Sequence, residues 1–348
     1  MVVVRTIAAA VLVALAVCGP RAQDVAVPPD REAAVQRAWR LLTTALESGN
    51  LDEQRVAIVA LSRAGTPRAL SLVESVARTG SSSTRRVALA VLPEQPSYLP
   101  LLTEGFQDQD DDTRRVVIHK LGQVRDPRSV LLLQDILMAG DPALVESVSS
   151  SIRALAPLSL PALLQCLATC AELARQKAAI TLHVMLAPVF PHEDARGNFE
   201  AFRRLSSEPV LVKCLDDPHP DVRLSAALVL ARLGNPAGVD ELVRATRDAR
   251  SSSVLSKYVA MAALNALGRP GYLAPLVTGL SDAERAVRSD AAFGMRAFPH
   301  PSLYGAVMSV WRATSDFPAF IVLLSLGGST DRALLRDALA NKDPAVRF

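Results

Sequence analysis

Apolar residues recur along most of this chain with the spacing of one face of a helix. Counted from Arg223, the residues three, seven and ten positions later are Ala226, Leu230 and Leu233. This spacing places the three side chains on one stripe of an α-helix. A small first residue lets a neighbouring helix approach closely. The longer residues fill the interface between stacked repeats, which we call the seam. Equivalent triplets are Val117, Leu121 and Val124; Ala260, Leu264 and Leu267; and Ala291, Met295 and Phe298.

The charged residue that precedes each stripe returns with a period of about 30 residues, which is the signature of a repeat protein. We call it the repeat marker. The markers are Arg55, Arg85, Arg114, Arg223, Lys257, Arg288 and Arg347. Weaker copies of the pattern lie near Glu146, Arg175 and Pro318, and the step from Arg175 to Arg223 is longer than the others.

Prolines divide each repeat into two helices, because proline ends one helix and opens the turn into the next. They follow the marker at a nearly constant offset, at Pro67, Pro96, Pro127, Pro236, Pro270 and Pro301. The pattern predicts an all-α fold for residues 31–348, a right-handed α-solenoid of about ten two-helix repeats.

The segment DPHPDVR, from Asp217 to Arg223, is followed by the small and apolar residues described above and resembles a HEAT repeat. The repeat length is similar to that of the short bacterial HEAT-like repeats that also occur in phycobilisome lyases. The resemblance covers most of residues 31–348. It is specific for architecture and says almost nothing about function. The expected shape is a curved rod whose concave surface suits a protein or an extended peptide, and we assign no catalytic residue and no cofactor.

Acidic or amide residues stand six positions before several markers: Asp108, Asp217, Asp282 and Asn341. One interpretation is a ladder of arginines that binds an anionic ligand. The interpretation we favour is structural, because such residues cap helix N-termini and an arginine in the same turn pairs with them or with the next repeat.

Residues 1–22 form a signal peptide by their pattern. Arg5 is the only charge before the apolar run of residues 7–17, and a short polar exit follows. Residues 23–30 then form a linker. An alternative interpretation of the LAVC sequence that ends at Cys18 is a lipid anchor on that cysteine. We expect an exported protein, either periplasmic or extracellular, whose first solenoid helix covers residues 29–46 with Asp30 as its N-cap.

Charge and hydropathy exclude two classes of partner. Cleavage after Ala22 removes Arg5 and Arg21 and leaves 36 basic and 35 acidic residues. The mature chain therefore lacks the surplus of positive charge that binding to nucleic acid requires. No later segment is an uninterrupted apolar run long enough to span a membrane.

Cys166 and Cys170 lie four residues apart in an apolar helical stretch. Two cysteines on one helical face have poor geometry for a disulfide. We therefore expect both to pack in the core as thiols.

Residues 187–208 interrupt the repeat period and form the candidate binding loop, since insertions in solenoids map to loops on one face. We expect a surface loop whose removal leaves the fold intact. Its candidate contact residues are His192, Glu193, Asp194, Arg196, Arg203 and Arg204. The histidine and its acidic neighbours, with His183 upstream, could be zinc ligands by type, but adjacent residues rarely converge on one metal and we assign no metal site.

No catalytic motif is present. The sequence therefore indicates a non-catalytic protein–protein interaction scaffold. The alternative is an enzyme, because HEAT-like relatives include bilin lyases and a DNA glycosylase. The residues from Asn341 to Phe348 open a new repeat, so we expect the chain to be truncated at its C-terminus. The protein could also be part of a larger enzyme whose catalytic domain lies beyond residue 348.

Overall fold

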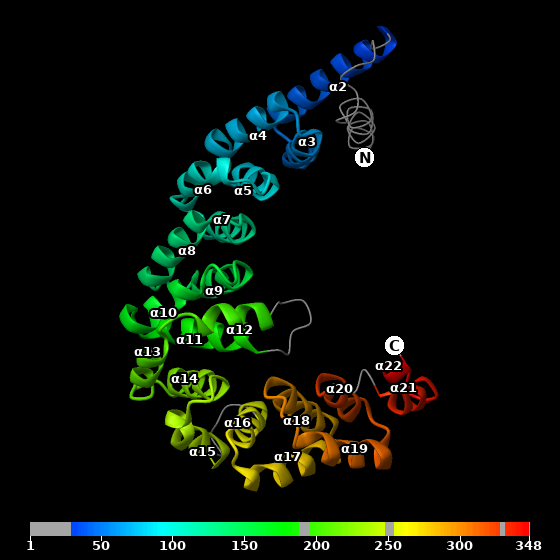
Figure 1. Cartoon of the computed structure of the whole chain (residues 1–348). Coiled ribbons are helices and arrows are strands. Elements are labelled where there is room, and N and C mark those ends of the chain that lie inside the picture. Colours follow the sequence, from blue (N-terminus) through cyan, green and yellow to red (C-terminus); the bar gives the residue numbers. More distant parts are fainter. Residues whose placement is uncertain (1–28, 188–194, 248–253, 328–330, 348) are drawn as a thin grey trace. The chain divides into compact units, whose positions relative to one another are not determined.

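The computed structural model describes residues 29–187, 195–247, 254–327 and 331–347 (Figure 1). Within these ranges all regular structure is helical, which confirms the all-α class. The chain divides into two compact units, the first ending at Leu155 and the second beginning at Ala156. The predicted signal peptide and Cys18 lie outside the described residues.

The first unit is a stack of helix pairs. In it α3, α5, α7 and α9 pack one on the next, α4, α6 and α8 form a second layer, and α2 packs on α3. The helices are α2 Pro29–Glu47, α3 Leu51–Ala64, α4 Pro67–Thr79, α5 Ser82–Val91, α6 Leu99–Phe106, α7 Asp111–Gln123, α8 Pro127–Ala139 and α9 Val145–Ala154, with a 3₁₀ turn at Pro96–Tyr98.

The second unit is also a stack of helices, in which α11, α14, α16, α18, α20 and α22 follow one another in one layer. Its helices are α10 Leu160–Thr169, α11 Glu172–Leu186, α12 Ala195–Arg203, α13 Glu208–Cys214, α14 Pro220–Arg232, α15 Val239–Arg247, α16 Val254–Ala266, α17 Leu273–Leu280, α18 Arg285–Ala297, α19 Leu303–Thr314, α20 Phe317–Ser325, α21 Arg332–Leu339 and α22 Pro344–Arg347. Two 3₁₀ turns lie at Pro236–Gly238 and Pro270–Tyr272.

Local sequence fixes where these helices begin and end. The Asp110 carboxylate accepts the backbone N–H of Thr113, and that of Asp126 accepts the N–H of Arg128, so each caps a helix N-terminus. Pro127 then occupies the first turn of α8, where its missing N–H costs nothing. Gly234 has a φ of 78°, a conformation that a side chain would oppose.

Most of the apolar stripe fills the seams as the sequence predicts, whereas Leu233 and Leu267 are only partly buried. Leu230 and Leu264 are completely buried, and Leu121 is 1% exposed. Small residues allow the close approach of neighbouring helices. A Cβ added to Gly294 of α18 would lie 2.7 Å from the backbone carbonyl of Tyr258 in α16. The two helices therefore touch backbone to backbone at this point.

Two local predictions are wrong. Helix α2 begins at Pro29, so Asp30 lies in its first turn instead of capping it. Cys166 and Cys170 form a disulfide. Two helical cysteines would have poor disulfide geometry, but α10 ends at Thr169 and Cys170 is an extended C-cap with φ −74° and ψ 158°. Leaving the helix brings the two Cα atoms to 4.8 Å, within the range that a disulfide spans.

Candidate functional site

Several marker arginines form hydrogen bonds across the seam between two consecutive repeats. The guanidinium of Arg85 donates Nη1–H to the carbonyl oxygen of Gly80 at 2.7 Å and Nε–H to the Asp108 carboxylate at 2.8 Å. Gly80 belongs to the turn before the arginine, whereas Asp108 opens the following repeat. One side chain therefore joins two repeats by charge-assisted bonds.

The same two bonds recur in the second unit. Arg288 donates to the carbonyl of Asp282 at 2.9 Å and to the Asp316 carboxylate at 2.5 Å. Arg175 donates to the carbonyl of Cys170 at 2.8 Å and to the Asp217 carboxylate at 2.5 Å. We call this set the Arg–Asp ladder, consisting of the pairs Arg85–Asp108, Arg175–Asp217 and Arg288–Asp316.

Other markers depart from the ladder. Arg223 binds the Asp217 carbonyl at 2.8 Å and its side-chain partner is Glu241 at 3.3 Å. Arg347 binds the carbonyl of Asn341 at 2.7 Å. The remaining three markers make weaker or different pairs: Arg55 lies 3.8 Å from Asp52, Arg114 contacts Asp111 and lies 3.7 Å from Asp141, and Lys257 is exposed.

Part of the candidate binding loop is a helix that packs into the fold. Helix α12 lies against α11. Its Phe202 is completely buried and its Asn198 is 4% exposed, with the amide donating to the Met185 carbonyl at 3.3 Å. The expectation that residues 187–208 form a dispensable surface loop is therefore wrong for this half, because α12 supplies core residues.

The candidate contact residues of the loop divide into two groups. His192, Glu193 and Asp194 lie outside the described residues. Arg196, Arg203 and Arg204 are exposed, and Arg203 forms an ion pair with Glu200 at 3.5 Å on the same helix. In the part of the chain that the structure describes, no group of three or more His, Cys, Asp or Glu side chains could hold a metal ion.

Arg232, at the end of α14, connects the ends of two other helices through hydrogen bonds. The sequence did not predict this role. Its guanidinium donates to the carbonyl oxygens of Leu186, at the end of α11, and Ala297, at the end of α18. The ring of Phe298 lies 5.1 Å from it and that of Phe199, on α12, lies 5.9 Å away. These carbonyls and ring faces offset its charge. Burial lowers the pKa of Arg232 to about 10.

His183 of α11 lies in the field of this guanidinium. Burial, and secondarily the charge of Arg232, lower the pKa of His183 to about 4. The imidazole is therefore neutral at neutral pH. In the sequence, both residues occupy ordinary positions on amphipathic helices, so no pattern distinguishes them from solvent-facing residues.

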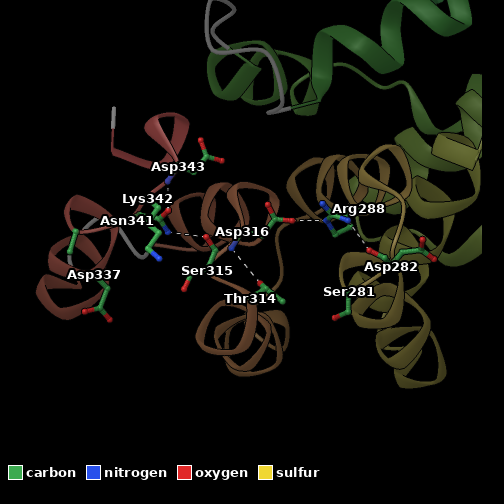
Figure 2. Close-up of a pocket in the computed structure, with 11 residues that line it drawn as sticks. Ser281, Asp282, Arg288, Thr314, Ser315, Asp316, Asp337, Asn341, Lys342 and Asp343 are labelled. Carbon is green, nitrogen blue, oxygen red and sulfur yellow. Dashed lines mark hydrogen bonds and ion pairs between the residues drawn. The ribbon is translucent and has the colours of Figure 1, made fainter.

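A polar pocket of about 730 Å³ lies at the last seams of the second unit (Figure 2). Arg288 and Asp316 face each other on one side of it, and Asn341 donates to the carbonyl of Ser315 at 2.9 Å on the other. The residues that line it are Ser281, Asp282, Arg288, Thr314, Ser315, Asp316, Asp337, Ala340, Asn341, Lys342 and Asp343.

The carboxylates of this pocket outnumber its cations. Asp316 is paired with Arg288. Within the described ranges, the carboxylates of Asp282 and Asp343 accept hydrogen bonds only from backbone N–H groups, those of Glu284 and Ala345. Among the described residues no cation lies within ion-pair distance of Asp282, Asp337 or Asp343. The pocket therefore has a surplus of negative charge and suits a cationic group.

The fold and the Arg–Asp ladder define a protein built from stacked two-helix repeats. The family model for HEAT repeats matches residues 207–296, which span α13 to α18. Residues 207–296 are therefore HEAT-like repeats, and they lie in the second unit. No helix among the described residues has the length and apolar character needed to cross a membrane.

Comparison with solved structures finds human deoxyhypusine hydroxylase in a complex with glycerol. It is 20% identical in sequence, with a TM-score of 0.26, and the match covers 86% of this chain and 98% of that one. A similarity this low carries no conclusion about activity. No curated protein sequence matches the chain.

Proposed function

We propose that this protein is an exported, non-catalytic scaffold that binds another protein through a segment carrying basic side chains. The observation that carries the proposal is the pocket at the last seams of the second unit. Its Asp282, Asp337 and Asp343 carboxylates have no cationic partner among the described residues. A lysine or arginine side chain of a partner would supply the missing charge.

The charged residues of the Arg–Asp ladder are engaged within the fold, which supports a binding role for the pocket. The Arg–Asp ladder joins Arg85, Arg175 and Arg288 to carboxylates of the next repeat, so these guanidiniums already have partners. The apolar stripe is similarly buried in the seams. Stacked repeats therefore leave their outer faces and pockets for a partner.

The disulfide between Cys166 and Cys170 supports the proposal of export. Disulfides persist in oxidising compartments and are rare in the bacterial cytosol. The N-terminal residue of the purified protein tests this point. We expect Gln23 after cleavage of the signal peptide, whereas a lipid-modified Cys18 at the N-terminus would establish the lipoprotein alternative. A retained Met1 would contradict export.

Selection of peptides from a random displayed library on the immobilised mature chain tests the binding function. We expect enrichment of lysine and arginine in the bound peptides and a loss of binding at high salt, because exposed charges are screened. The double variant Asp337→Lys/Asp343→Lys should lose at least about tenfold in affinity, equivalent to about 1.4 kcal/mol.

Arg203→Glu/Arg204→Glu reverses two exposed charges elsewhere in the second unit, and it also tests the alternative that residues 187–208 are the binding site. It should leave peptide affinity unchanged. If both double variants lose affinity equally, the pocket is not the binding site. If no peptide is enriched and the purified protein carries stoichiometric metal or pigment, the scaffold function is wrong and the alternative of a lyase-type enzyme gains support.

A further inference from the structure

We propose that the Cys166–Cys170 disulfide is a redox-sensitive clamp on the seam between helices α10–α11 and helices α13–α14. The inference does not depend on which partner the protein binds. It rests on the position of the disulfide at one end of a continuous chain of polar bonds across this seam.

The chain of bonds begins at the backbone of Cys170. The carbonyl of this residue accepts Nη1–H of Arg175 at 2.8 Å, and Nε–H of Arg175 binds the Asp217 carboxylate at 2.5 Å. The Arg175 side chain is 20% exposed and that of Asp217 is 8% exposed. Since water competes weakly at such burial, the pair is a strong link between the two repeats.

The link continues into the first turn of α14. The Asp217 carboxylate also accepts the backbone N–H of His219 at 2.8 Å, and the Asp217 carbonyl accepts Nη1–H of Arg223 at 2.8 Å. A change in the position of the Cys170 carbonyl therefore acts through Arg175 and Asp217 on the start of α14.

The disulfide fixes that carbonyl. Cys170 leaves the helix with extended backbone angles. Besides the disulfide, a hydrogen bond from its N–H to the Cys166 carbonyl at 2.9 Å ties it to the last turn of α10. At the equivalent place in the first unit, Gly80 makes the same bond to Val76 without any disulfide. Reduction should therefore loosen this turn without unfolding the helix.

A dithiol is the reductant that we consider here. One thiolate of the dithiol attacks Sγ of Cys170, which is 7% exposed, while Cys166 is completely buried. The S–S bond breaks and the Cys166 sulfur leaves and takes up a proton. The second thiol of the dithiol then releases Cys170, so two electrons and two protons pass to the protein and the dithiol becomes a disulfide.

The third cysteine of the mature chain does not disturb the clamp. Cys214 is a buried free thiol, and burial together with the charge of Asp217 raises its pKa to about 11. It therefore stays protonated at neutral pH and does not exchange with the disulfide. It lines a pocket of about 430 Å³ with Leu167, Ala168, Arg175 and Asp217, so the clamp also sets the shape of this pocket.

Hydrogen exchange of the intact mature chain, oxidised and after reduction with dithiothreitol, tests the clamp. Reduction should speed exchange several-fold at the amides from Cys170 to Arg175 and at those from Asp217 to Arg223, while amides in the first unit are unchanged. Intact mass confirms the redox state, because reduction adds two hydrogens. Cys166→Ser/Cys170→Ser should reproduce the reduced pattern without reductant, and Cys214→Ser should keep the response to reductant.

Arg175→Ala distinguishes a clamp from a disulfide that acts only on its own helix. In this variant the amides from Asp217 to Arg223 should exchange quickly in both redox states, while the Cys170 turn still responds to reduction. The proposal fails if the native oxidised chain carries three free thiols, or if reduction leaves the α14 amides unchanged. It also fails if those amides respond as strongly in Arg175→Ala as in the wild type.

Discussion

Arg288 of α18 and Asp316, the N-cap of α20, join two consecutive repeats through a charge-assisted hydrogen bond of 2.5 Å. Asp316 accepts the N–H of Phe317 with its other carboxylate oxygen, so it caps α20 and binds the neighbouring repeat at the same time. The stability of the seam therefore depends on both ends of this bond.

Replacing Arg288 with alanine should lower the free energy of unfolding by about 1.5–3 kcal/mol, the usual range for a hydrogen bond to a charged group. Arg288→Lys should recover only part of the loss, because lysine lacks the planar fork that reaches both the Asp282 carbonyl and Asp316. Denaturant melts measure both. Arg203→Ala is the control and should change stability by less than about 0.5 kcal/mol. Equal effects of Arg288→Ala and Arg203→Ala would show that the ladder adds no stability.

Helix α12 contributes to the core through Phe202. Phe202→Ala should cost about 3–5 kcal/mol, because it removes a completely buried ring and leaves a cavity. Glu200→Ala, on the exposed side of the same helix, is the matched control and should be nearly neutral. Thermal or denaturant unfolding measures the stability of both variants. A Phe202→Ala protein as stable as the control would restore the view of the insertion as a dispensable loop.

Gly294 marks the closest approach of α18 to α16. Gly294→Ala should destabilise by about 1–3 kcal/mol, because the new methyl group meets the backbone of Tyr258 and the helices must move apart. Gly305→Ala in α19 is the opposite case, since nothing lies within 4 Å of its added Cβ. That variant should gain about 0.4–1 kcal/mol from helix propensity and a less flexible unfolded chain. Two variants of equal stability would contradict the close packing at Gly294.

His183 makes stability depend on pH. Its pKa falls from 6.5 to about 4 on folding, so the unfolded chain takes up the proton first as pH decreases. The stability that His183 contributes is complete above pH 6.5 and is lost as pH falls towards 4. His183→Gln should remove this part of the pH dependence, measured as the difference between the two stability curves. An imidazole resonance of His183 that titrates near 6.5 in the folded protein would contradict it.

The sequence predicts those features of the fold that repeat. The stripe that contains Leu230 and Leu264, and the prolines that open second helices, return with each repeat because every seam has the same packing requirement. These parts of the fold were therefore predictable.

The features that occur once were not predictable. Arg232 gains its role from carbonyls of two distant helix ends, and the disulfide depends on Cys170 leaving α10 one residue after Thr169. Both are set by tertiary geometry that no local pattern encodes. The pocket in Figure 2 has the same origin. Its carboxylates Asp282, Asp316 and Asp343 precede α18, α20 and α22, and Asp337 lies in α21, so they come from separate parts of the sequence.

Arg232 also changes how the second unit is expected to unfold. In an array where each repeat touches only its neighbours, stability is a sum of local terms and the ends can fray one repeat at a time. Arg232 instead binds carbonyls 46 residues before it and 65 residues after it, which belong to α11 and α18. The repeats between these helices share one guanidinium, so the segment from α11 to α18 should melt as a single cooperative block and the repeats outside it should open at lower free energy.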